Sequence, residues 1–293
     1  PSPPGQPFDR RARDGLGDKL GPASLVKGVA AGRQHVVHVV VACAVAGGVE
    51  ELGVADQRMT LAAQDGDRRL TAVDDANLTV APGEFVSLIG PSGAGKSTLF
   101  NIIAGLDKPD SGELRFDGTT AYMPQKDLLF PWRTIEANAA LGLEVQGVHK
   151  KEARARAREW FPQFGLEGFE EALPFQLSGG MRQRAALLRT VVQEKSTLLL
   201  DEPFGALDSL TRSELQTWLQ GMWAEHDWTA MLITHDVREA IMLSDRIVVL
   251  NPRPTSVREI IDVNLPRPRG TEVLSSPEFG ELERRILEHL QRH

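Results

Sequence analysis

The segment Gly90-Pro91-Ser92-Gly93-Ala94-Gly95-Lys96-Ser97 decides the fold. It fits the pattern Gly-x-x-x-x-Gly-Lys-Ser/Thr and lies between an apolar run at 85–89, expected to be a strand, and a helix expected over 96–104. Glycines let the backbone wrap closely around an anion with its N–H groups pointing inward, and the helix N-terminus adds partial positive charge. The segment therefore predicts a loop that binds phosphate groups.

Two side chains of this loop have expected chemical roles. We expect Lys96 to neutralise the β- and γ-phosphates of a nucleotide, and Ser97 to supply a hydroxyl to Mg²⁺, a hard cation that binds few protein oxygens. The alternative is a Gly-rich turn that binds nothing, which the strand-loop-helix context disfavours. The expected nucleotide-binding residues of the loop are Gly90, Pro91, Ser92, Gly93, Ala94, Gly95, Lys96, Ser97 and Thr98.

Short apolar runs alternate with longer helical segments along the rest of the chain. Besides 85–89, such runs occupy residues 197–200, 230–233 and 247–250, and Gly, Pro or Asp residues bound them. Continuous apolar strands separated by helices indicate an α/β fold with a largely parallel sheet.

Two segments depart from this alternation. Residues 78–80, followed by Pro82-Gly83, indicate an antiparallel hairpin that leads into the first core strand. Lys126–Arg184 contains no comparable β run and is predicted to be mainly helical, with Glu152–Phe161 as its clearest helix. We expect it to be a helical subdomain inserted into the α/β core.

The composition is that of an ordinary globular protein, with 293 residues of which 41% are hydrophobic and 25% charged. The formal net charge of −7 disfavours nucleic-acid binding, because such a chain lacks the positive field that attracts phosphate backbones. Cys43 is the only cysteine, so no internal disulfide is possible. The apolar stretch Val36–Gly48 is too short for a membrane span, which needs about 20 apolar residues.

Polar residues follow two of the apolar runs, where those strands are expected to end. Asp201-Glu202 follows 197–200, and Thr234-His235-Asp236 follows 230–233. We expect Asp201 to face Mg²⁺, usually through water, and Glu202 to polarise an attacking water. His235 could stabilise a γ-phosphate. Seen alone, acidic pairs and histidines of this kind are more often ordinary surface residues.

A third motif gives a specific resemblance. Leu177-Ser178-Gly179-Gly180-Met181-Arg182-Gln183-Arg184 resembles the signature motif of ABC transporter ATPases. This resemblance implies a P-loop NTPase core of the ABC ATPase type, with an antiparallel β subdomain and the helical insert. In that family two subunits dimerise head to tail, and the signature motif of one closes on the nucleotide of the other. The residues implied to act in trans are Leu177, Ser178, Gly179, Gly180 and Met181.

The resemblance extends from about Val49 to Leu265, with the motifs in the expected order. Gln125 resembles the Q-loop glutamine, which contacts Mg²⁺ or the lytic water. Asp208 is the acidic residue of a segment that resembles the D-loop, which runs along the dimer interface. The implied catalytic residues are Glu202, His235, which resembles the switch histidine, and Gln125; those implied around the metal are Ser97, Gln125 and Asp201.

One position departs from the family pattern. The family places an aromatic residue in its first strand, where it stacks on adenine, and this chain has Met59 at that position. A thioether can still pack on a ring face. The expected domains are an N-terminal extension over 1–47, uncertain or disordered; a nucleotide-binding domain over 48–265 with the helical subdomain at about 126–184; and a short C-terminal helical tail over 266–293.

The segment Lys126–Ile135 is unusually apolar for an exposed part of the helical subdomain. In the family it borders the groove that receives a coupling helix of the membrane subunit, and exposed apolar clusters commonly mark docking sites. The alternative is that Leu128, Phe130 and Trp132 form the core of the insert.

The sequence of residues 128–134 and that of the tail after Val263 most resemble the corresponding segments in ATPases of nitrate, sulfonate and taurine importers. ATPases of importers of pyrimidine precursors are close relatives of these. This implies an ATP- and Mg²⁺-dependent ATPase that forms a homodimer, docks on integral membrane permease subunits and works indirectly with a solute-binding protein, without nucleic acid. Its implied location is cytoplasmic, peripheral on the inner face of the cell membrane. The alternatives are a soluble ABC ATPase switch not linked to transport, and an inactive binding module.

Overall fold

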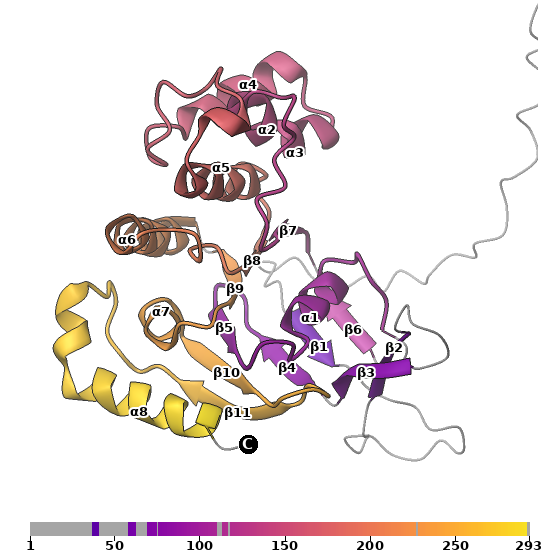
Figure 1. The fold of residues 1–293 in the computed structure, drawn as a ribbon, viewed down its shortest axis with the longest axis vertical. Helices are drawn as coiled ribbons and strands as arrows, with labels where there is room; N and C mark the ends of the chain where they lie inside the picture. The colour runs from indigo at the N-terminus through magenta and orange to yellow at the C-terminus, as the bar shows by residue number, and fades with distance from the viewer. Residues whose placement is uncertain are drawn as a thin grey trace, which may run out of the picture. The chain divides into compact units, whose positions relative to one another are not determined.

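The computed structural model describes residues 37–40, 58–62, 69–74, 76–109, 113–116, 118–226 and 228–291. These residues belong to one unit that spans positions 34–293 (Figure 1). The N-terminal extension expected over 1–47 is described only at β1 (Val37–Val40). Because β1 pairs with two other strands, the sheet structure begins before the expected boundary at residue 48.

A six-stranded sheet forms the centre of the fold, with the strand order β11-β10-β5-β9-β8-β7. All its neighbouring strands are parallel except β10 and β11, which are antiparallel. The strands are β5 (Phe85–Ile89), β7 (Thr120–Met123), β8 (Thr197–Asp201), β9 (Thr229–Ile233), β10 (Arg246–Leu250) and β11 (Val257–Asp262). Every residue of β5, β8 and β9 is buried, which explains their continuous apolar runs.

The prediction of an antiparallel hairpin around Pro82-Gly83 is wrong, because the strands on either side of this turn do not pair with each other. β4 (Asn77–Val80) pairs antiparallel with β1, and the other edge of β1 pairs antiparallel with β6 (Glu113–Phe116). The turn itself forms, since Glu84 N donates a 3.1 Å hydrogen bond to Ala81 O. It connects two different sheets, because β5 is buried on both faces and pairs in parallel with β9 and β10.

Side chains of β5 alternate between cores on the two faces of the central sheet. Val86 and Leu88 pack against the face covered by α1 (Lys96–Ile103) and by β4. Phe85 packs on the opposite face, in a core that includes α5 (Gly179–Val191) and α6 (Ser209–His226). Ile89 packs with α7 (Val237–Leu243) and α8 (Pro277–Gln291). The period of two residues in a strand accounts for this division.

A helical layer precedes α5 in the chain and completes the fold that the sequence predicts. It consists of α2 (Ile135–Ala139), α3 (Leu141–Val145), α4 (Lys150–Glu159) and the 3₁₀ turn η1 (Pro174–Gln176). Figure 1 shows α2, α3 and α4 gathered beside α5, apart from the β sheets. A further 3₁₀ turn, η2 (Thr271–Ser275), precedes α8, and the hairpin of β2 (Arg58–Ala62) and β3 (Arg69–Asp74) is antiparallel. The expected α/β class, with antiparallel β part and helical insert, is therefore confirmed.

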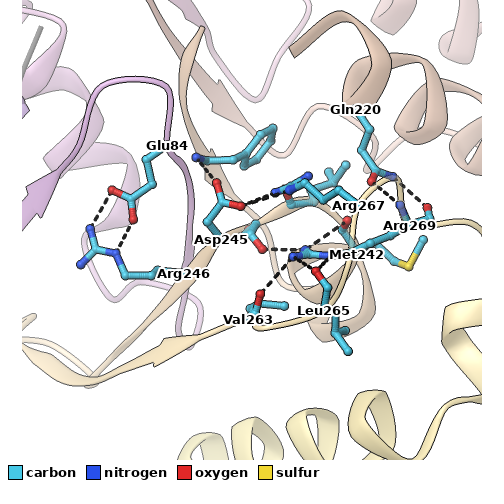
Figure 2. A network of polar contacts seen from close by, with 12 residues as sticks. Glu84, Gln220, Met242, Asp245, Arg246, Val263, Leu265, Arg267 and Arg269 are labelled. Carbon is cyan, nitrogen blue, oxygen red and sulfur yellow. Dashed lines mark hydrogen bonds and ion pairs between the residues drawn. The ribbon is translucent and has the colours of Figure 1, made fainter. Parts of the chain in front are cut away.

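Arg269 anchors the segment that follows β11 (Figure 2). Its side chain is almost completely buried, and its guanidinium donates hydrogen bonds of 2.7 and 2.6 Å to Ile241 O and Ser244 O at the C-terminal end of α7. It also reaches Val263 O at 3.1 Å and Leu265 O at 3.2 Å. Burial lowers the pKa of Arg269 to about 10, so the group stays charged at neutral pH. A buried cation at a helix C-terminus is stabilised by these carbonyl groups.

Arg267 and Asp245 make a second attachment beside Arg269 (Figure 2). Arg267 donates 2.9 and 3.1 Å hydrogen bonds to Asp245 Oδ1, and its guanidinium lies 4.2 Å from the ring centre of Trp223. The other carboxylate oxygen of Asp245 accepts a 2.9 Å bond from Phe85 N at the start of β5. The C-terminal segment is thus tied to the strand that leads into the phosphate loop.

Candidate functional site

A cleft of about 430 Å³ lies at the carboxyl ends of the central strands, where ligands bind in open α/β sheets. The predicted phosphate loop supplies most of its wall, with Gly90 and every residue from Ser92 to Thr98. Gln125, Asp201, Glu202 and His235 come from the loops or strand ends after β7, β8 and β9. The structure therefore brings together residues that are far apart in the sequence.

The phosphate loop has the strand-loop-helix context that its sequence predicts, since it connects β5 to α1. Gly95 has a φ of 83° and is the N-cap residue of α1. A Cβ atom at this position would lie 2.9 Å from both Ala72 O and Thr255 Oγ1, so only glycine fits both the conformation and the space. The backbone N–H groups at the start of α1 remain available for an anion.

Lys96 lines the cleft and is buried. Its ammonium group donates hydrogen bonds of 2.8 Å to Gly90 O and 3.0 Å to Pro91 O. Burial lowers the pKa of Lys96, while the nearby charges of Glu202 and Asp201 oppose that change. A cation held among carbonyl oxygens beside free backbone N–H groups can bind the phosphates of a nucleotide.

The backbone at the end of β8 turns both carboxylates toward the cleft. Consecutive side chains of a strand point to opposite faces, but Glu202 has a φ of 50°, in the left-handed region. Its N–H still bonds to Ile233 O at 2.9 Å. Such a conformation costs a non-glycine residue about 1–3 kcal/mol and is found mostly at functional sites. The sequence alone did not reveal this turn.

Glu202 is the centre of a group of three polar side chains. Gln125 Nε2 donates a 3.0 Å hydrogen bond to Glu202 Oε2, and His235 Nδ1 lies 3.4 Å from Glu202 Oε1. The side chain of His235 is 69% exposed and that of Glu202 is 22% exposed, so solvent reaches the group. A carboxylate in this position can orient and polarise a water molecule for attack on a phosphate in the cleft.

Asp201 and Ser97 are among the residues expected to face Mg²⁺, and the structure places them together in the cleft. The side chain of Asp201 is buried, and burial raises its pKa, while hydrogen bonds from Ser97 and Tyr122 act in the opposite direction. Magnesium binds one or two protein oxygens, keeps several waters and bridges substrate phosphates, so the pair Ser97 and Asp201 fits it. Bound there, the ion would neutralise negative charge that develops during phosphoryl transfer. Within the described ranges, no cluster of three or more His, Cys, Asp or Glu residues forms a separate metal site.

A hydrogen-bonded network surrounds the backbone on both sides of His235. Thr234 Oγ1 donates a 3.1 Å bond to the buried Glu239 Oε2, and Asp236 caps the N-terminus of α7. Arg212 donates to Asp236 Oδ2 at 3.5 Å and to Leu207 O at 3.1 Å. Burial raises the pKa of Glu239 to about 8. The network connects the His235 loop to the 205–208 segment that resembles the D-loop.

Other predicted site residues lie away from the cleft. Ser178 is exposed and is the N-cap of α5, where its hydroxyl accepts a 3.2 Å hydrogen bond from Met181 N. The signature segment Leu177–Met181 contributes no residue to the wall of the cleft. Asp208 is also outside the cleft and accepts a 3.0 Å bond from Thr211 N at the start of α6. Met59 belongs to β2, but its side chain lies outside the described part of the structure.

Three residues near the site were not predicted from the sequence. Arg253 lines the cleft, Tyr122 hydrogen-bonds to Asp201, and Glu239 supports the backbone before His235. The only sequence signal for Arg253 is its position between two prolines shortly after the apolar run at 247–250. Tyr122 and Glu239 gave no local signal, because their contacts depend on strand pairing and burial.

The phosphate loop, the buried Asp201 and the group around Glu202 together define a phosphate-loop nucleoside triphosphatase. Comparison with known proteins places the chain within this class. The family model described as ABC transporter matches residues 73–205. The chain is 44% identical over 231 residues to an uncharacterized ABC transporter ATP-binding protein of Methanocaldococcus jannaschii, with 76% of this chain and 85% of the relative covered.

Other relatives have named import functions. The aliphatic sulfonates import ATP-binding protein SsuB of Bacillus cereus is 40% identical over 233 residues, covering 77% of this chain and 90% of the relative. The formylaminopyrimidine import ATP-binding protein ThiZ of Halalkalibacterium halodurans is 47% identical over 184 residues, covering 62% of this chain and 74% of the relative. A dimeric bacterial ABC transporter cassette has a similar structure, with a TM-score of 0.67 and 29% identity over 78% of this chain and 99% of that chain. A structure of the same cassette in a post-hydrolysis state, bound to ADP and Pi, has the same TM-score, identity and coverage.

The chain therefore belongs to the ABC transporter family, as an ATP-binding subunit with ATPase activity. No helix within the described ranges has the length and apolarity needed to cross a membrane.

Proposed function

We propose that this chain energises the import of a small solute, working as a homodimer that holds two MgATP between its subunits. The assigned roles are those given above: phosphate binding by residues 90–98, Mg²⁺ contacts by Ser97, Gln125 and Asp201, and catalysis by Glu202, His235 and Gln125. Leu177–Met181 and Asp208 act across the dimer interface, and Met59 contacts adenine. The proposed location is the cytoplasmic face of the cell membrane.

The position of the signature segment supports the dimer. Ser178 and Gly179 are exposed at the N-terminus of α5, where backbone N–H groups can bind a phosphate, yet the segment does not line the cleft of its own chain. A second copy placed head to tail would give each cleft the missing donors. A similar cassette has been solved as a dimer, which agrees with this arrangement.

An exposed apolar loop carries the proposal of transport. Leu128 is 59% exposed and Trp132 is 73% exposed, so the alternative in which they form the core of the helical insert is wrong for these two residues; Phe130, 36% exposed, lies between them. The ring centres of Phe130 and Trp132 are 5.2 Å apart. Exposed aromatic side chains grouped in this way mark a protein docking surface. We assign this docking surface, formed by Leu128, Phe130 and Trp132, to the permease subunits.

The docking surface is held in a fixed shape and is connected to the site. The side chain of the buried Asn138 accepts a 2.7 Å hydrogen bond from Phe130 N. Its Nδ2, which has two hydrogens to donate, lies 3.1, 3.1 and 3.0 Å from Phe130 O, Arg133 O and Thr134 O. Arg189 donates a 2.8 Å bond to Leu128 O. Only Lys126 and Asp127 separate this surface from Gln125, so movement at Glu202 can reach the docked partner.

The solute itself is selected by other subunits. Among the relatives, SsuB is named for aliphatic sulfonates and ThiZ for formylaminopyrimidine. We propose a small solute such as nitrate, a sulfonate or taurine, delivered to the permease by a solute-binding protein. Mg²⁺ is proposed as the ion that accompanies ATP.

The test removes the apolar surface without altering the site. In the double variant Leu128→Ala, Trp132→Ala, ATP hydrolysis by the purified subunit is expected to stay within about twofold of the parent, while co-purification with the membrane subunits and solute uptake are lost. Leu106→Ala, 69% exposed after α1, is the matched control and retains both. A double variant that still binds the membrane subunits and supports uptake would contradict the proposal and favour a soluble ATPase switch.

A further inference from the structure

The loop between β10 and β11, residues 251–256, is seated directly against the phosphate loop. Asn251 N donates a 3.0 Å hydrogen bond to Ser256 O, which closes the loop. Thr255 is completely buried, and its N–H donates a 3.0 Å bond to Ala72 O of β3. The space beside Gly95 is so small that a Cβ there would lie 2.9 Å from Thr255 Oγ1. The position of the 251–256 loop is thus fixed relative to the cleft.

Arg253 lies at the tip of this loop and lines the cleft. Its side chain is exposed, and it forms no hydrogen bond or ion pair with any residue that the structure describes. The other arginines discussed above bond to carboxylates or carbonyl groups. A planar cation that faces a nucleotide-binding cleft without a protein partner is available to a ligand.

The strand order shows which end of the nucleotide Arg253 faces. β5, which leads into the phosphate loop, has β9 on one side and β10 on the other. His235 and Glu202 follow β9 and β8, so the γ-phosphate and its attacking water belong on that side. Arg253 follows β10, on the opposite side. The nucleoside must extend away from the hydrolysed phosphate, and therefore toward the 251–256 loop.

The β2–β3 hairpin meets the same loop. Val73 of β3 forms a bridge with Thr255 and is also the register partner of Met59 in β2. The family resemblance places Met59 at the position of an adenine-stacking aromatic residue. Arg253 therefore lies two residues along the chain from the contact between its loop and this hairpin.

We infer that Arg253 stacks its guanidinium on the purine ring of the nucleotide. The proposal rests on ATP being the ligand of the cleft. Arginine guanidinium groups stack on aromatic rings and on nucleic-acid bases, and the attraction combines planar contact with the charge of the cation. Lys96 and the N-terminus of α1 already supply positive charge at the phosphates. Arg253 thus provides base contact in a chain without the aromatic residue.

The experiment compares a ligand that has a base with one that lacks it. MgADP and magnesium tripolyphosphate are titrated calorimetrically into the full chain and into Arg253→Ala. The variant is expected to bind MgADP about three- to tenfold more weakly and tripolyphosphate within twofold of the parent. Arg253→Lys keeps the charge without the plane and is expected to remain at least threefold weaker for MgADP.

Two control variants separate the possible failures. Arg156→Ala removes an exposed arginine on α4 and is expected to bind both ligands like the parent. Lys96→Ala is expected to lose affinity for both ligands. If this variant binds both ligands like the parent, the assignment of the nucleotide site is wrong, and not only the role of Arg253. An Arg253→Ala variant that binds MgADP normally overturns the inference. Equal weakening of both ligands would show a phosphate contact, and full rescue by lysine would show charge alone; either result also overturns it.

Discussion

Gln125 Nε2 donates a 3.0 Å hydrogen bond to Glu202 Oε2, although the two residues are 77 positions apart. His235 Nδ1 lies 3.4 Å from the other oxygen of the same carboxylate. The residue that we assign to water activation is therefore oriented by two loops that follow different strands. We therefore expect a change in either loop to alter the orientation of Glu202 in the cleft.

Gln125→Ala tests this orientation. We expect kcat to fall by about 10- to 100-fold, because misplacement of a catalytic group by about 1 Å can cost 100-fold in rate. The affinity for MgATP is expected to change less than kcat, because the phosphate loop, Ser97 and Asp201 still hold the nucleotide and its ion when the contact from Gln125 is removed. Phosphate-release kinetics and equilibrium binding measure the two quantities. A variant with normal kcat would show that the hydrogen bond to Glu202 is dispensable.

Lys96→Ala tests the phosphate site. Hydrogen bonds to charged groups contribute about 1.5–3 kcal/mol, so we expect the Kd for MgATP to rise by about 10- to 100-fold. Lys126→Ala, an exposed lysine outside the cleft wall, is the matched control and is expected to bind normally. Isothermal titration calorimetry gives both constants. Equal affinities for the two variants would be incompatible with the assigned role of Lys96.

Glu239 predicts a pH dependence of stability. Burial raises the pKa of Glu239 to about 8 from its ordinary value of about 4.5, and the side chain faces Thr234, Asp236, Arg212 and Glu202. Between about pH 4.5 and pH 8, Glu239 therefore holds a proton in the folded state that it has released in the unfolded chain. Its contribution to the free energy of unfolding is complete below about pH 4.5 and decreases as the pH rises to about 8.

Glu239→Gln removes this titration while keeping a hydrogen-bonding side chain of the same size. We expect the wild type to lose several degrees more of Tm than the variant between pH 5 and pH 8.5, because about 1 kcal/mol corresponds to about 2–4 °C in a domain of this size. Thermal unfolding at several pH values measures the difference. Parallel Tm profiles would refute a protonated Glu239.

Arg269→Met tests the anchoring of the C-terminal segment. The substitution leaves several buried carbonyl oxygens without donors, among them Ile241 O and Ser244 O, and we expect a loss of about 2–4 kcal/mol in the free energy of unfolding. Arg284→Met on the exposed face of α8 is the control and is expected to change stability by less than about 0.5 kcal/mol. Denaturant titration measures both. Equal stability of the two variants would contradict the structural role of Arg269.

The sequence predicted the parts of the fold that depend on local pattern. The apolar runs at 85–89, 197–200, 230–233 and 247–250 lie in strands, because burial on both faces requires continuous apolar residues. The prediction of a hairpin at Pro82-Gly83 was wrong, because a turn signal shows where the chain reverses but not which strands pair. β1 was missed for the same reason, as its pairing with β4 and β6 is non-local.

Tertiary contacts explain what the sequence could not predict at the site. The left-handed φ of Glu202 is set by the bond from its N–H to Ile233 O and by its neighbours, not by its residue type. The burial of Glu239 depends on the packing of α7, and the place of Arg253 in the cleft depends on the seating of Thr255 against β3. Motif spacing identified the residues of the phosphate loop, but not this support.

The most direct test uses Glu202→Gln, which removes the carboxylate that we assign to water activation and keeps a side chain of the same shape that can still form hydrogen bonds. We expect ATP hydrolysis to fall by at least 100-fold. Sedimentation velocity with MgATP should then show dimers, and the same protein without nucleotide should sediment as a monomer. A variant that remains monomeric with saturating MgATP, or that still hydrolyses ATP at the parent rate, would contradict the account of a nucleotide held and hydrolysed between two copies of this chain.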